Sequence, residues 1–153
     1  MSIWWSLHLR REAASVPLAR RLLLGAMETA GVDPDISFDL SVALSEACAN
    51  AVEHGGDDPT GEAPGGYRVT AYLDGELCRI EVADSGPGFP SRRVVRRTTP
   101  APVPAPTSEN GRGLCLIEQL ADHVHFRNRP GHGAVVSFDK ILKWREDALL
   151  RAM

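Results

Sequence analysis

Residues 67–84 constrain the fold more than any other part of this sequence. In 67–73 every second side chain belongs to one apolar set, which consists of Tyr67, Val69, Ala71 and Leu73. Asp74-Gly75 then offers a two-residue hairpin turn into a second strand that ends at Asp84. In that strand, one face carries Cys78, Ile80, Val82 and Asp84. The chain therefore contains a β-hairpin whose single apolar face needs a covering layer.

Other segments repeat this pattern or show helical spacing of apolar residues. Alternation predicts strands over 3–9, 124–126 and 134–138, with a Pro130-Gly131 turn between the last two. Helical spacing predicts helices over 17–31, from Asp33-Pro34 to His54-Gly55, from Leu114 onward, and over 141–150. About five strands with one apolar face each are covered by helices on one side only. We expect an α+β fold: a two-layer α/β sandwich with a mixed, mostly antiparallel sheet, formed by one domain over 1–153.

Composition limits the function classes. With 153 residues and 43% hydrophobic content the chain can bury one core, and its net charge of −3 disfavours nucleic acid as the main ligand. Cys48, Cys78 and Cys115 are widely spaced among apolar neighbours, which indicates buried thiols in a reducing compartment rather than a disulfide or a zinc site. There is no signal-peptide pattern, and no apolar run approaches the ~20 residues of a membrane helix. We expect a soluble cytoplasmic protein that binds small molecules or proteins, not membranes.

The predicted helix that ends at His54 has a polar ridge beside its apolar stripe. The stripe comprises Ile36, Leu40, Ala43, Leu44, Ala47 and Ala51. Glu46, Asn50 and His54 follow at four-residue spacing, which places successive members ~6 Å apart along the axis on one edge of the stripe. The Asn50 amide oxygen suits Mg²⁺, and the Glu46 carboxylate suits a general base. The alternative is a solvated helix face, with His54 as a C-terminal cation.

Asp84 ends the apolar face of its strand, so its carboxylate points into the layer between sheet and helices. An unpaired buried carboxylate is costly, and the exocyclic amine of adenine would be a suitable donor. Gly86 and Gly88, on either side of a proline, allow the backbone to approach a flat ring. The alternative is that Asp84 caps the turn at 85–88.

A long proline-rich segment, 89–110, has no apolar periodicity and predicts a mobile loop. Its arginines can fold over a polyphosphate: Arg92, Arg93, Arg96 and Arg97. The loop leads into a helix through a segment whose unpaired N–H groups can hold phosphates, namely Gly111, Arg112, Gly113 and Leu114. The alternatives are a solvated basic stretch and a plain loop-to-helix junction.

Three segments in this order resemble the GHKL ATPase and kinase superfamily, with its Bergerat nucleotide site, and within it the bacterial anti-sigma-factor serine/threonine kinases. Residues 43–55 (ALSEACANAVEHG) are similar to the N box of that kinase group. Residues 84–89 (DSGPGF) resemble the first glycine box, and residues 111–117 (GRGLCLI) resemble the second. The resemblance spans nearly the whole chain.

The resemblance implies an ATP and Mg²⁺ site. By it, Asn50 coordinates Mg²⁺, Asp84 bonds the adenine amino group, and Gly86 and Gly88 lie against the base. The phosphates would be held by Gly111, Arg112, Gly113 and Leu114, with residues 89–110 as the ATP lid.

The resemblance also implies an activity. Glu46 would be the general base toward a serine of an anti-anti-sigma factor of the STAS type. The kinase would also hold a sigma factor inactive, as a homodimer, and would exchange partners according to phosphorylation and nucleotide state. It would thereby regulate transcription without binding nucleic acid itself.

Two departures from the family pattern leave other functions open. Ala134 follows Gly133 in the last hairpin, where the family often has a threonine, and the loop is unusually rich in proline. The alternatives are a nucleotide-binding interaction module without kinase activity and a simple ATPase. A sensor histidine kinase would need a helical dimerisation segment with a phosphoacceptor histidine, and no such segment fits here.

Overall fold

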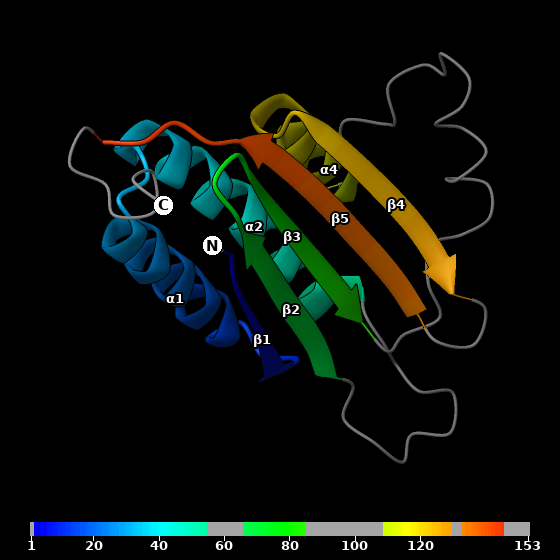
Figure 1. Ribbon diagram of the computed structural model, residues 1–153. Coiled ribbons are helices and arrows are strands. Elements are labelled where there is room, and N and C mark those ends of the chain that lie inside the picture. The colour runs from blue at the N-terminus through cyan, green and yellow to red at the C-terminus, as the bar shows by residue number, and fades with distance from the viewer. Residues whose placement is uncertain (1, 55–65, 85–108, 130–132, 146–153) are drawn as a thin grey trace.

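A computed structural model describes residues 2–54, 66–84, 109–129 and 133–145 (Figure 1). The strands are β1 (Ile3–Arg10), β2 (Gly66–Leu73), β3 (Leu77–Asp84), β4 (His123–Arg129) and β5 (Gly133–Ile141). The helices are α1 (Ser15–Ala30), α2 (Pro34–His54) and α4 (Glu109–Leu120). The predicted strands are confirmed, as are the first two helices.

The strands form one five-stranded sheet in the order β1-β2-β3-β5-β4. All four pairings among the described strands are antiparallel, so the expected mixed character is absent from this part of the chain. The helices lie on one face of the sheet, behind the strands in Figure 1. The predicted two-layer architecture is therefore correct.

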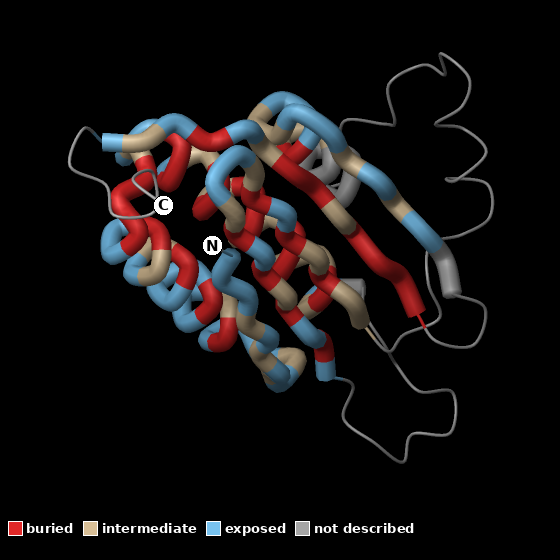
Figure 2. The backbone as a smooth tube through the Cα atoms, in the orientation of Figure 1, coloured by how far each residue is buried: buried red, intermediate tan, exposed pale blue. Residues whose placement is uncertain are grey.

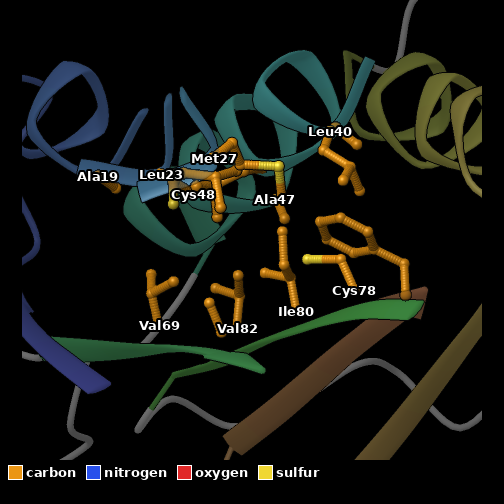
Figure 3. Packing of buried hydrophobic residues seen from close by; sticks show 14 of the residues in the cluster. Ala19, Leu23, Met27, Leu40, Ala47, Cys48, Val69, Cys78, Ile80 and Val82 are labelled. Atoms are coloured by element: carbon orange, nitrogen blue, oxygen red, sulfur yellow. The ribbon is translucent and has the colours of Figure 1, made fainter. Parts of the chain in front are cut away.

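The core fills the space between the sheet and the helices (Figure 3), and buried and exposed positions alternate along β2 (Figure 2). Phe138, Leu23, Met27, Leu40 and Ile80 are among its largest fully buried side chains. Burying such a side chain contributes about 1.5–3 kcal/mol relative to leaving it exposed. This apolar contact fixes α1 and α2 on the sheet.

Short polar signals define the junction between α1 and α2. Gly31 ends α1 with φ of 91°, and its N–H donates to the carbonyl oxygens of Glu28 and Met27. A left-handed residue at this position favours glycine because it has no Cβ. Asp33 then caps α2, since its Oδ1 accepts a hydrogen bond of 2.8 Å from the N–H of Asp35.

The hairpin turn differs from the prediction by one residue. Asp74 N donates to Leu77 O at 3.0 Å, so Gly75 and Glu76 form the tip instead of Asp74 and Gly75. Asp74 Oδ1 accepts 2.7 Å hydrogen bonds from the N–H groups of Glu76 and Leu77. Asp74 thus stabilises the turn from its first position, as aspartate commonly does.

The prediction of a helix over 141–150 is wrong for residues 141–145, and residues 146–150 lie outside the described part of the chain. Ile141 ends β5, and the following residues extend past the α1–α2 junction, where Trp144 forms a β-bridge with Val32. The Lys143 carbonyl accepts 2.7 Å from Asp33 N, and Arg145 N donates 2.8 Å to Gly31 O. Partners distant in sequence satisfy this backbone, so a helix has no advantage there.

Two further expectations concern the cysteines and the membrane. All three cysteines are free thiols; Cys48 and Cys78 are buried, as predicted, whereas Cys115 is half-buried. Among the described residues, no helix combines the length and apolar character that crossing a membrane requires.

Candidate nucleotide site

The ridge on α2 borders the core. Ile36 to Ala51 form the predicted stripe, with every stripe residue buried, and Glu46 and Asn50 are half-buried at its edge. Asn50 Nδ2 is buried and has no hydrogen-bond partner within the described part of the chain. An unsatisfied buried polar group costs about 1–3 kcal/mol. Asn50 therefore has the environment of a residue that receives a ligand.

Lys140 on β5 shows which way this edge of α2 faces. Its Nζ donates to the carbonyl oxygen of Leu120 at 2.7 Å and lies 3.8 Å from Asp39 Oδ2. Asp39 precedes Glu46 by seven residues, or nearly two turns, so both lie on the same side of α2. Glu46 and Asn50 therefore lie on the side of α2 that faces β5 and α4.

The first turn of α4 comes level with Asn50. Helices α2 and α4 pack against each other, and their chain directions are opposed (Figure 1). Lys140 contacts both Leu120, the last residue of α4, and Asp39 on α2, so these two residues lie at the same level. From there, Asn50 lies about three turns further along α2, and Glu109 lies about three turns back along α4. The start of α4 is thus brought to the ridge.

The helix starts earlier than predicted. It begins at Glu109, so Gly111, Arg112, Gly113 and Leu114 lie within its first two turns instead of before it. Glu109 and Asn110, which were expected to end the loop, are helical as well. The N–H groups free of intrahelical bonds belong to the first turn. Phosphate binding by this segment stays a prediction.

Asp84 lies half-buried at the end of β3, on the face of Cys78, Ile80 and Val82, as predicted. Its Oδ1 accepts a 3.1 Å hydrogen bond from Ala134 N on β5. The donor that this carboxylate needs therefore comes at least in part from the chain itself, which the sequence did not indicate.

Tyr67 ties this end of the sheet to both helices. It lies opposite Asp84 in the β2–β3 register, and its hydroxyl hydrogen-bonds Ser15 at the start of α1. Tyr67 also lies near the Cys48 thiol on α2, whose pKa burial raises to about 12 from 9.0. Cys48 lies two residues from both Glu46 and Asn50, which places it ~3 Å from each along the helix axis but on the opposite side of α2. The Asp84 end of the sheet therefore lies at the same level along α2 as the ridge.

Some predicted residues lie outside the described part of the chain, namely Gly86, Gly88, the turn at 85–88, and the loop arginines at 92–97. Gly133 was missed as a site residue. Its φ is +100°, and a Cβ there would lie 2.2 Å from Asp84 O. The sequence did contain one signal for this residue, namely a glycine at the start of a predicted strand.

The donor set fits a nucleotide with Mg²⁺. The described residues include no group of three or more His, Cys, Asp or Glu side chains able to hold a metal ion. Mg²⁺ commonly takes one or two protein oxygens and completes its shell with substrate phosphates and water. The Asn50 amide oxygen is of the ligand type that Mg²⁺ takes, and its unpaired Nδ2 can donate to an anion held near the helix N-terminus.

Comparisons with known proteins find matches over most of the chain. A model of the histidine kinase-like ATPase domain matches residues 9–140. The serine-protein kinase RsbW of Oceanobacillus iheyensis is 33% identical over 135 residues, covering 86% of this chain and 82% of that protein. The serine-protein kinase RsbW of Bacillus licheniformis is 35% identical over 132 residues, covering 83% and 78%.

Two solved structures share the fold. The RsbU and RsbW domains of Rv1364c from Mycobacterium tuberculosis align with a TM-score of 0.63 at 22% identity, over 91% of this chain and 33% of that longer chain. The catalytic domain of the histidine kinase ThkA aligns with a TM-score of 0.55 at 14% identity, over 92% and 99%. The predicted α+β Bergerat-type fold is thereby confirmed.

Proposed function

Because the chain belongs to the histidine kinase-like ATPase domains and, within them, to the group of the RsbW serine-protein kinases, we propose that it binds ATP with Mg²⁺ and phosphorylates a serine of a partner protein. The observation that carries this proposal is Asn50. Its buried Nδ2 lacks a partner in the described chain, and the side chain lies one turn from the Glu46 carboxylate, level with the start of α4.

Each site residue has a role in this proposal. The Asp84 carboxylate accepts a hydrogen bond from the exocyclic amine of adenine. Asn50 offers its amide oxygen to Mg²⁺, and the N–H groups in the first turn of α4 hold phosphate oxygens. Bound Mg²⁺ neutralises charge on the phosphates. Glu46 accepts the proton of the attacking serine hydroxyl. The serine oxygen forms a bond to the γ-phosphorus, the bond from that phosphorus to the bridging oxygen breaks, and ADP leaves.

We further propose the partners that the kinase group has. They are an anti-anti-sigma factor of the STAS type as the serine substrate and a sigma factor held inactive by a homodimer. Exposed apolar side chains on the helices support a protein-binding role: Leu18 and Leu22 on α1 are 55% and 44% exposed, and Phe38 on α2 is 64% exposed. Affinity purification from the native cell followed by mass spectrometry, with light scattering for the oligomeric state, tests these partners.

The test of the transferase activity uses Glu46→Gln. With ATP, Mg²⁺ and the anti-anti-sigma protein, the wild type should produce phosphoserine detectable by mass spectrometry. Glu46→Gln should lower the transfer rate by about 100-fold or more, the usual contribution of a general base, while ATP affinity changes little. Glu28→Gln, on the exposed side of α1, is the matched control and should transfer at the wild-type rate.

The outcomes separate the candidate functions. Equal transfer by wild type and Glu46→Gln contradicts the role of Glu46. Nucleotide binding without transfer to any partner favours an interaction module, a reading that Ala134 in place of the usual threonine supports. Steady phosphate release without a protein substrate indicates a simple ATPase.

A further inference from the structure

The start of β5 approaches Asp84 unusually closely. At Gly133 an added Cβ would lie 2.2 Å from the Asp84 carbonyl oxygen and 2.6 Å from Asp84 Oδ1. Contacts this short do not occur for real Cβ atoms, and the φ of +100° also disfavours any residue with a side chain. Glycine is therefore required at 133 for the backbone to reach the carboxylate.

Ala134, the residue after Gly133, forms a hydrogen bond with Asp84 because the two strands come so close here. In the β3–β5 ladder the last paired residues are Ala83 and Val135. Beyond that pair, Ala134 N donates to the Asp84 side chain at 3.1 Å. Asp84 is also fixed from the β2 side, where it lies opposite the buried Tyr67. The carboxylate is thus held by a backbone N–H of the neighbouring strand β5.

We propose that Gly133 and Ala134 are positioning residues for nucleobase recognition: they hold Asp84 Oδ1 on the Ala134 N–H and so orient the carboxylate toward the 6-position of a purine. This inference rests on the proposed binding of ATP at Asp84. A carboxylate is only an acceptor, so the oriented group favours a 6-amino purine, which donates, over a 6-keto purine, which accepts.

The hydrogen bond from Ala134 makes the effect of Asp84→Asn predictable. The amide oxygen of asparagine is the only acceptor that can stay on the Ala134 N–H, so the amide nitrogen takes the place of the second oxygen. The variant then presents a donor where the wild type presents an acceptor. A donor there suits the 6-keto group of inosine triphosphate and opposes the amine of ATP.

The first experiment measures ATP and inosine triphosphate affinities by calorimetry with Mg²⁺. The wild type should prefer ATP by about tenfold or more, because a site with a fixed polar group rejects a mismatched analogue. Asp84→Asn should abolish or reverse that preference. If Asp84→Asn weakens both nucleotides by the same factor, Ala134 does not orient residue 84, and the proposal is wrong.

The second experiment tests the two positioning residues by the same affinity ratio. Gly133→Ala and Ala134→Pro should each reduce the ATP preference at least several-fold, since the first displaces the strand end and the second removes the N–H that Asp84 uses, although proline also fixes φ at residue 134. General loosening would weaken both nucleotides equally and leave the ratio unchanged. Gly25→Ala is the matched control: a Cβ at Gly25 meets nothing within 4 Å, and the wild-type ratio should persist.

Two further results would overturn the proposal. A wild-type ratio in Ala134→Pro contradicts positioning by this backbone while ATP binding itself stands. Absence of any nucleotide binding by the wild type contradicts the proposed function, and the base-recognition proposal falls with it. Circular dichroism of each variant identifies a folding defect, and Ala134→Pro decides the question if Gly133→Ala does not fold.

Discussion

At the scale of single residues, burial changes the chemistry of three ionisable groups in the core. Burial raises the pKa of the Cys48 and Cys78 thiols from 9.0 to about 12 in each case. It also raises the pKa of Tyr67 from 10.0 to about 12. Desolvation is the main cause for all three, because the apolar layer disfavours thiolate and phenolate. These side chains act as neutral packing and hydrogen-bonding groups.

An alkaline loss of stability follows from these shifts. The folded state holds these protons more tightly than the unfolded state, so their stabilisation is complete below pH 9 and is lost as the pH rises from 9 to 12. Each group adds a slope of at most about 1.4 kcal/mol per pH unit within its window. Urea unfolding from pH 8 to 11 measures it. The double variant Cys48→Ala, Cys78→Ala should be less stable at pH 8 but should lose stability less steeply; an unchanged slope contradicts this account.

At the scale of elements, the segment after β5 holds the α1–α2 junction. Trp144 Nε1 donates to Gly75 O at 2.9 Å, and Leu142 N donates to Glu76 O at 2.9 Å. The same segment bonds Gly31 and Asp33 between the helices. It therefore links the tip of the β2–β3 hairpin to the start of α2, the helix that carries Glu46 and Asn50.

Trp144→Phe tests this link. Phenylalanine keeps most of the ring packing but loses the N–H, so the free energy of unfolding should fall by about 1 kcal/mol, the usual net value of a hydrogen bond. Chemical denaturation followed by circular dichroism measures the change. Trp4→Phe on β1 is the control, because Trp4 is 66% exposed and should change stability by less than about 0.5 kcal/mol. Equal effects of both variants would contradict a specific role for Trp144.

At the scale of the whole molecule, the candidate site joins the two layers. Asn50 and Glu46 belong to the helical layer, whereas Asp84 and Ala134 belong to the sheet. A ligand that contacts both layers binds the folded state only, so it stabilises the entire fold. The site therefore links nucleotide binding to global stability.

This linkage predicts that one variant, Asn50→Ala, keeps or gains stability without ligand but loses the stabilisation that the ligand gives the wild type. ATP with Mg²⁺ at 100 times its Kd should stabilise the wild type by about 2.7 kcal/mol. Asn50→Ala removes a buried amide nitrogen that lacks a partner in the described chain, so the free protein should be equally or more stable, yet most of the ligand-induced shift should disappear. Scanning calorimetry with and without ligand measures both effects. A full ligand shift in Asn50→Ala would exclude Asn50 from the site.

The sequence by itself determined the layers and the phase of each main element. Period-two alternation at 67–84 and helical spacing at 36–51 identified the faces that are buried, because local geometry alone turns such residues to one side. The same phase placed Asp84 and Asn50 at the border of the core. The order of the three motifs predicted the family.

Only the tertiary structure decided which donors and acceptors from distant parts of the chain form hydrogen bonds with each other. The apolar spacing after β5 predicted a helix, yet in residues 141–145 the backbone hydrogen bonds go to Gly31, Asp33 and Glu76, and no local pattern reveals such distant partners. The glycine spacing at 111–113 likewise predicted a later start for α4, whereas the helix begins at Glu109. Gly133 and Ala134 lie against Asp84 because β5 lies beside β3. Strand order thus sets the surroundings of Asp84, and it depends on contacts that are not local in sequence.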